Sequence, residues 1–315
     1  MMAGRDARAY FLPRGGLSQA GQADTREALA AYERAIRLRP GYAEAYNNRG
    51  NVLCNMGQYE AAIADYDEAI ELRPDYAEAY SNRGNAKAAV GRSQEAISDF
   101  GLAIERRPGY GLAFFNRGLV CLSLEAYEEA VVDFSETVRL MPEFASAYFE
   151  LGKARAALEQ YQEAVSDYSG AVRLNPDFAE AYNNRGSALV ALGHYEAAIA
   201  DYDQVVRLEP ACAEAYNNRG IAQAKLGRHG AAIADYDLAI RWKPERGEPY
   251  FNRGAAKERQ GSCEEAIADY DQAILLQPDD VEAYRNRAVA KAALGRTAEA
   301  RADIAAALAI GNRGG

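Results

Sequence analysis

The sequence predicts an all-α protein, an α-solenoid in which antiparallel helix hairpins stack in tandem. Eight of the ten prolines recur every 34 residues, and glycine, alanine and aromatic residues keep fixed places between them. Proline cannot continue a helix, and glycine readily ends one in a left-handed conformation, so each period contains two helices and two turns. The recurring prolines are Pro40, Pro74, Pro108, Pro142, Pro176, Pro210, Pro244 and Pro278.

The period defines eight tandem repeats without a gap when the first repeat begins at Ala43. They span residues 43–76, 77–110, 111–144, 145–178, 179–212, 213–246, 247–280 and 281–314. Residues 9–42 fit a degenerate N-terminal repeat, because Tyr32 matches a second helix whereas Pro13 would break a first one. We expect residues 9–24 to be irregular or only partly helical, and residues 1–8 to form a flexible tail.

Small and aromatic side chains occupy fixed positions in each repeat. Position 8 is glycine until Ala288 in the last repeat, position 20 is always alanine, and position 24 is aromatic until Ile304. Two helices that meet at small residues approach closely, and a larger side chain would cost roughly 1–3 kcal/mol through overpacking. We expect the aromatic ring at position 24 to fill the space beside position 8.

The residues at these positions resemble the tetratricopeptide repeat, and the resemblance covers residues 43–314. In the first repeat it is carried by Tyr46, Gly50, Tyr59, Ala62, Tyr66, Ala69 and Pro74. Arrays of this family coil as right-handed superhelices whose first helices line the inner surface, and the resemblance implies the same shape here. The array is also similar to the tetratricopeptide region of O-GlcNAc transferases.

Composition argues against several classes of function. The 315-residue chain has a net charge of -10 and a pI of about 5.0, whereas a nucleic-acid-binding protein needs a basic surface. No apolar run is long enough to span a membrane, so we expect a soluble, cytoplasmic protein that binds neither nucleic acid nor membrane. The four cysteines lack metal-binding spacing, which predicts free thiols, no metal site and no cofactor.

Position 6 carries an asparagine on the side of the first helix that the packing does not need. These residues are Asn48, Asn82, Asn116, Asn184, Asn218, Asn252 and Asn286, with Glu150 as the exception. Amides at equal spacing could hydrogen-bond the repeating N–H and C=O groups of an extended peptide, each adding about 0.5–1.5 kcal/mol. This asparagine ladder resembles that of O-GlcNAc transferases and kinesin light chains. The alternative is a consensus residue that only caps or solvates the helix.

The third and fourth repeats carry apolar residues on the same side, namely Leu112, Phe115, Leu119 and Phe149. Exposed aromatic and aliphatic side chains near the middle of an interface usually anchor a partner, so these residues are candidate peptide contacts. The alternative is that the aromatic residues at position 5 serve packing.

Arginine at position 7 and aspartate at position 23 form two charged columns. We predict that they form bidentate ion pairs with a structural role. In that case the groove is near neutral, because the net positive charge of the first helices comes from these arginines. The alternative is that they bind acidic ligands. Leu151 replaces the arginine in the fourth repeat, while Asp167 remains.

No catalytic motif is present: the sequence lacks G-x-S-x-G, a P-loop and a dinucleotide-binding fingerprint, and His194 and His229 fall at predicted turns. We therefore predict a non-catalytic protein–protein interaction scaffold that binds an extended peptide segment of a partner in its concave groove. The alternative is a structural or oligomer-forming module, or the targeting arm of a larger enzyme complex. Weak self-association through the terminal repeats would fit that alternative.

Overall fold

The computed structural model describes residues 19–312, with side chains from residue 25 onward. Within this range the protein is entirely helical, with 17 helices and no strand, which confirms the predicted α-solenoid. The flexible tail expected for residues 1–8 and the irregular segment up to residue 18 lie outside the described residues. Helix α2 (Gln19–Leu38) begins inside the stretch expected to be irregular, since glutamine and alanine there favour a helix.

Each repeat contributes a first helix and a second helix. The first helices are α3 (Ala43–Asn55), α5 (Ala77–Ala89), α7 (Gly111–Ser123), α9 (Ala145–Ala157), α11 (Ala179–Ala191), α13 (Ala213–Lys225), α15 (Gly247–Arg259) and α17 (Val281–Ala293). The second helices are α4 (Tyr59–Leu72), α6 (Ser93–Arg106), α8 (Tyr127–Leu140), α10 (Tyr161–Leu174), α12 (Tyr195–Leu208), α14 (His229–Trp242), α16 (Cys263–Leu276) and α18 (Thr297–Gly311).

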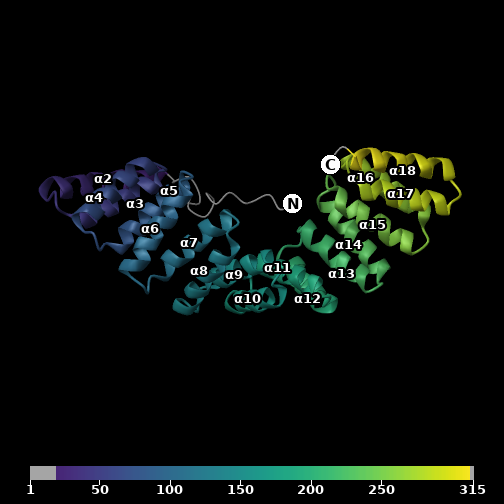
Figure 1. Ribbon diagram of the computed structural model, residues 1–315, viewed down its shortest axis with the longest axis horizontal. Coiled ribbons are helices and arrows are strands. Elements are labelled where there is room, and N and C mark those ends of the chain that lie inside the picture. Colours follow the sequence, from purple (N-terminus) through teal and green to yellow (C-terminus); the bar gives the residue numbers. More distant parts are fainter. Residues whose placement is uncertain (1–18, 313–315) are drawn as a thin grey trace. The chain divides into compact units, whose positions relative to one another are not determined.

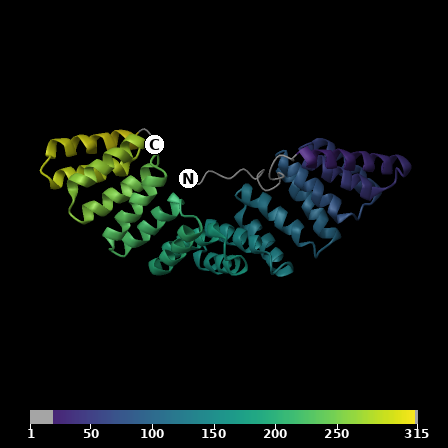
Figure 2. The same cartoon turned by 180° about the vertical axis from the view of Figure 1, so that it is seen from behind.

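The chain divides into two compact units, residues 1–160 and 161–315. Within each unit, consecutive helices pack side by side, as both views of the ribbon show (Figures 1 and 2). First helices of neighbouring repeats also touch directly, as α3 does with α5 and α13 does with α15. The first helices therefore form a continuous layer in each unit. We call its surface at repeat positions 2, 5, 6 and 9 the first-helix face.

In six repeats the glycine at position 8 allows the hairpin to close around an aromatic ring. A Cβ atom built on Gly50 would lie 2.6 Å from Cε1 of Tyr66, and one on Gly186 would lie 2.8 Å from Cε1 of Tyr202. No unstrained structure holds a contact that short, so the predicted pairing of positions 8 and 24 is confirmed. The last repeat changes both partners together, to Ala288 and Ile304.

The turn inside each hairpin requires a left-handed residue at position 15. Glycine takes this conformation in six repeats, with φ between 72° and 84°. In the third and fourth repeats the residue is Glu125 (φ 59°) or Glu159 (φ 58°). These two turns keep the same geometry as the others, at a cost of roughly 1–2 kcal/mol for an L-residue with a Cβ atom.

Candidate functional site

The seven asparagines at position 6 all lie on the first-helix face and all are half-buried. The structure thus places them neither beneath neighbouring helices nor fully in solvent. Glu150, at the same position in the fourth repeat, is buried and pairs with Lys153 at 2.7 Å. The ladder of amides therefore has one interruption, at the place the sequence indicates.

Three of these amides bond to the preceding repeat, a contact that the 34-residue period by itself does not predict. Nδ2 of Asn82 donates to Oδ1 of Asn47 in the preceding repeat at 2.9 Å. Asn252 donates to Asn217 in the same way at 3.0 Å, and Asn218 donates to Asn183 at 3.3 Å. The acceptors all stand at position 5. An amide at position 5 followed 35 residues later by one at position 6 is the sequence signal that could have revealed this pairing.

In unit 2 the pairing continues to a carboxylate. Nδ2 of Asn183 donates to Oε1 of Glu214 at 3.1 Å, and Nδ2 of Asn217 donates to Oε1 of Glu248 at 3.0 Å. Each position-5 amide thus bridges two residues that lie one turn apart on the next first helix. We call each set of three residues an amide relay: Asn218, Asn183 and Glu214 form one, and Asn252, Asn217 and Glu248 form the other.

The apolar candidates divide between core and surface. The expected exposure is wrong for Phe149 and Leu119, which are only 3% and 5% exposed. Phe115 is half-buried, with its ring centroid 4.8 Å from that of Phe144, and only Leu112 is well exposed, at 44%. Leu119 lies in one core cluster with Leu151 and Ala154 of the next first helix, and a helical wheel of one isolated helix cannot include that contact.

The arginines at position 7 are held in ion pairs, which confirms the structural prediction. Each donates Nε and Nη2 to the two oxygens of the position-23 aspartate in its own hairpin, and all seven aspartates are buried. The pairs are Arg49–Asp65, Arg83–Asp99, Arg117–Asp133, Arg185–Asp201, Arg219–Asp235, Arg253–Asp269 and Arg287–Asp303. Guanidinium groups engaged in this way are poorly placed to bind an acidic ligand.

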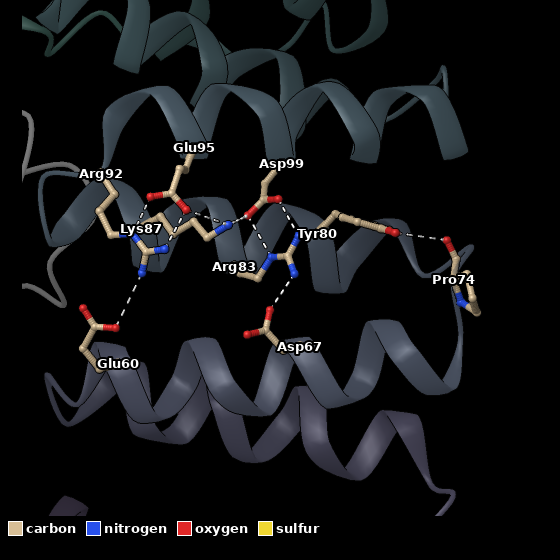
Figure 3. A network of polar contacts seen from close by, with 9 residues as sticks. All are labelled: Glu60, Asp67, Pro74, Tyr80, Arg83, Lys87, Arg92, Glu95 and Asp99. Atoms are coloured by element: carbon tan, nitrogen blue, oxygen red, sulfur yellow. Dashed lines mark hydrogen bonds and ion pairs between the residues drawn. The ribbon is translucent and has the colours of Figure 1, made fainter.

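Four of these arginines also reach the preceding repeat. Figure 3 shows Arg83 between Asp99 of its own hairpin and Asp67 of the first repeat, where Nη1 pairs with Oδ1 at 2.6 Å. We call this contact, between positions 7 and 25 of consecutive repeats, the cross-repeat ion pair. The others are Arg219–Asp203, Arg253–Asp237 and Arg287–Asp271.

Burial shifts the pKa of two cysteine thiols. Burial raises the pKa of the Cys121 thiol to about 11 and also raises the pKa of the Cys54 thiol. Both stay protonated at neutral pH and are poor nucleophiles. In the described part of the chain, the four cysteines are free and no group of three or more acidic, histidine or cysteine side chains is arranged to hold a metal ion.

None of the helices from residue 19 to residue 312 combines the length and the apolar character needed to cross a bilayer.

Family models match most of the chain. The model described as TPR repeat matches residues 50–91, 152–193 and 259–295. Two further models, each described as Tetratricopeptide repeat, match residues 81–143 and 183–246 in one case and residues 31–64 in the other. The stacked hairpins define an α-solenoid built for contacts with other proteins. The chain belongs to the tetratricopeptide repeat family.

Solved structures share this fold. YrrB, described as a TPR protein with an unusual peptide-binding site, is 28% identical, with a TM-score of 0.53 over 59% of this chain and 95% of that chain. MamA from Desulfovibrio magneticus RS-1 is 25% identical, with a TM-score of 0.51 over 54% and 96%. A tetratricopeptide repeat protein from Parabacteroides merdae, 18% identical with a TM-score of 0.55 over 79% and 98%, shares the fold alone. No curated protein matches the sequence.

Proposed function

We propose that this protein is a non-catalytic scaffold that binds an extended segment of a partner protein along its first-helix face, in a concave groove. The observation that carries the proposal is the ladder of seven half-buried asparagines. Burial restricts their side chains, so ordering them on binding costs little conformational entropy. YrrB, with its peptide-binding site, is the relative that supports this reading.

The apolar part of the face supplies a second kind of contact. Leu112 stands at position 2, where six of the other repeats carry glutamate, and it is exposed beside the half-buried Phe115. Leu119 belongs to the core cluster against which Phe115 packs, and Phe149 is buried, so neither side chain is exposed to a ligand. An apolar side chain of the partner would bury Leu112, at roughly 25 cal/mol for each Å² removed from water.

Replacing Asn184, Asn218 and Asn252 together by alanine tests the ladder. The variant should lose at least about tenfold in affinity for partners captured from the source lysate and identified by mass spectrometry. Titration calorimetry with the identified partner gives the affinity, and circular dichroism checks that the helices persist. The matched control replaces Gln162, Gln204 and Gln272, amides on second helices, by alanine. Equal affinity of the two variants would contradict the proposal.

A second candidate is self-association through the last repeat. An open apolar hollow of about 380 Å³ lies on its hairpin, lined by Ala288, Val289, Ala292, Thr297, Ala300, Arg301 and Ile304. Val289 in its lining and Leu308, on the same helix as Ile304, are more than half exposed. A second copy of the chain could cover this apolar surface. Light scattering across a range of concentrations tests it: Ile304→Asp should abolish any self-association, and a wild-type monomer at every concentration would exclude it.

A further inference from the structure

The amide relays of unit 2 have a fixed polarity. A carboxylate can only accept, so the side-chain atom with which Asn183 contacts Glu214 must be its NH₂ group. Its Oδ1 then faces the other way and must accept from the NH₂ group of Asn218. The same logic orients Asn217 between Glu248 and Asn252. The carboxylate at the end of each relay therefore determines that the position-6 asparagine gives an N–H group to the relay and keeps its carbonyl oxygen out of it.

The position-6 asparagine thus keeps an acceptor, its carbonyl oxygen, together with its second N–H group. Asn218 gives one N–H to Asn183, so its Oδ1 and its second N–H stay outside the relay, and Glu214 uses Oε1, which leaves Oε2. Glu214 and Asn218 are four residues apart on α13, so their side chains lie on the same side of the helix one turn apart. Glu248 and Asn252 repeat this arrangement on α15. Each first helix thus presents a carboxylate beside an amide oxygen.

The two carboxylates also lack the cation that their counterparts in unit 1 have. Glu44 pairs with Arg73 and Glu78 pairs with Arg107, the residue at position 31 of the same repeat. At that position the seventh repeat carries Gln277, which has no charge, and the sixth carries Lys243, whose nitrogen is not within ion-pair distance of Glu214. Within the described residues, no lysine or arginine nitrogen lies within 4.0 Å of Glu214 or Glu248, and the nearby position-7 arginines are held by aspartates.

Helix electrostatics explain only part of this pattern. A glutamate in the first turn stabilises a helix through its dipole, by about 0.3–1 kcal/mol, and this would account for glutamate at position 2 in any repeat. It does not account for a relay that keeps an amide oxygen free one helical turn from the carboxylate. Two acceptors one turn apart, one of them charged, match a donor that is cationic and carries several N–H groups.

We propose that the first-helix face of α13 and α15 binds the lysine or arginine side chains of an extended partner segment, one cation to each carboxylate and amide pair. This inference rests on the proposed function and names the chemistry of its ligand. Because α13 and α15 are in contact, their axes are about 8–10 Å apart. Three residues of polyproline II chain span about 9.3 Å, so the segment carries a basic residue at every third position.

Peptide binding tests this directly. The probe is a labelled peptide of about twelve residues with lysine at every third position and glycine, serine and proline elsewhere, measured by fluorescence anisotropy. Two comparison peptides carry glutamine or glutamate in place of lysine. The protein variant is Glu214→Gln with Glu248→Gln, which keeps an oxygen that can accept from Asn183 and Asn217 and so preserves the relays. The control, Glu163→Gln with Glu196→Gln, removes two first-turn glutamates from second helices.

The lysine peptide should bind more tightly than either comparison peptide. Its affinity should be about tenfold lower for the variant at Glu214 and Glu248 than for the wild type, and less than about twofold lower for the control variant. Its affinity should also fall as salt rises. Equal losses in both variants would show a non-specific charge effect and overturn the inference. A glutamine peptide that binds as tightly, and that weakens with Asn218→Ala, would overturn the charge assignment while leaving the proposed function intact. If no peptide binds, the inference fails, and the lysate capture described above judges the proposed function separately.

Discussion

Arg83 and Asp67 form an ion pair of 2.6 Å that joins the second repeat to the first. The same guanidinium holds the buried Asp99 of its own hairpin through hydrogen bonds of 2.6 and 2.8 Å. A buried carboxylate without a partner would destabilise the fold by several kcal/mol, and the Arg83–Asp99 pair prevents this loss of stability. The third donor, Nη1, is left to link consecutive repeats.

The cross-repeat ion pair is missing around the middle of the array. Position 25 is Gly101 in the second repeat, Ser135 in the third and Ser169 in the fourth, where Arg185 donates to the serine hydroxyl at 3.0 Å. The third and fourth repeats also hold the two glutamates with positive φ. In a solenoid, stability is close to a sum over repeats and their interfaces. We therefore expect these repeats to open more readily than the outer ones.

Restoring the missing acid should stabilise the interface between the second and third repeats. A Cβ atom on Gly101 would lie 3.8 Å from Nη1 of Arg117, an ordinary contact, so Gly101→Asp fits and places a carboxylate near that arginine. Loss of a helix glycine and gain of a partly buried ion pair should together add about 1 kcal/mol. Native-state hydrogen exchange of the amides in α7 and α8 measures the gain. The uncharged variant Gly101→Asn is the control, and equal protection in both would refute the ion pair.

Relieving the strained turns should also stabilise the middle repeats. Glu125→Gly removes the conformational strain of an L-residue with positive φ, about 1–2 kcal/mol. The greater conformational entropy of glycine in the unfolded chain reduces this stabilisation by roughly 0.4–1 kcal/mol. The net gain should be about 0.5–1 kcal/mol, and Glu159→Gly should behave alike. Urea unfolding measures it. Glu125→Ala keeps the Cβ atom, so a similar gain in that variant would show that φ strain is not the cause.

Periodicity alone predicted the hairpins, the left-handed turns and the Arg–Asp pairs, because each depends on residues within one 34-residue unit. What it missed depends on the neighbouring unit. Leu119 is buried in a cluster with Leu151 and Ala154 of the next first helix, and the cross-repeat ion pair needs two repeats to be stacked before Asp67 and Arg83 become neighbours. The direction of the amide relays is likewise invisible in the sequence, since it is determined by which oxygen or nitrogen faces Glu214 or Glu248.

Positions 8 and 24 should be energetically coupled. Gly186→Ala would bring a Cβ atom to 2.8 Å from Tyr202 and should destabilise the fifth repeat by about 1–3 kcal/mol, although alanine is otherwise the better helix former. Combining it with Tyr202→Ile reproduces the Ala288 and Ile304 pair of the last repeat. The double variant should lose less stability than the sum of the single variants, with a coupling of about 1 kcal/mol in a double-mutant cycle. Strict additivity would show that the two side chains do not compete for the same space.

Two buried aspartates should respond to pH with opposite sign. Burial by itself would raise the pKa of Asp303, but hydrogen bonds from Arg287 and Lys291 outweigh it and lower the pKa below the ordinary value. Burial raises the pKa of Asp133, and its bonds to Arg117 offset this only in part. In the third repeat position 11 is Cys121, where the last repeat has Lys291, so Asp133 lacks the second cation at that position.

The sign of each effect follows from linkage. The unfolded pKa of aspartate is about 3.9. Asp303 contributes stability that is present above this value and lost as the pH falls through its lower folded pKa, so the wild-type advantage over Asp303→Asn should shrink in acid. Asp133 is protonated at a higher pH in the folded state than in the unfolded state. The free energy of unfolding of the wild type should therefore rise relative to that of Asp133→Asn as the pH falls from the raised pKa of Asp133 toward about 3.9. Urea unfolding of the three proteins between about pH 3 and pH 7 measures both differences, and trends of the same sign would contradict the role assigned to Lys291.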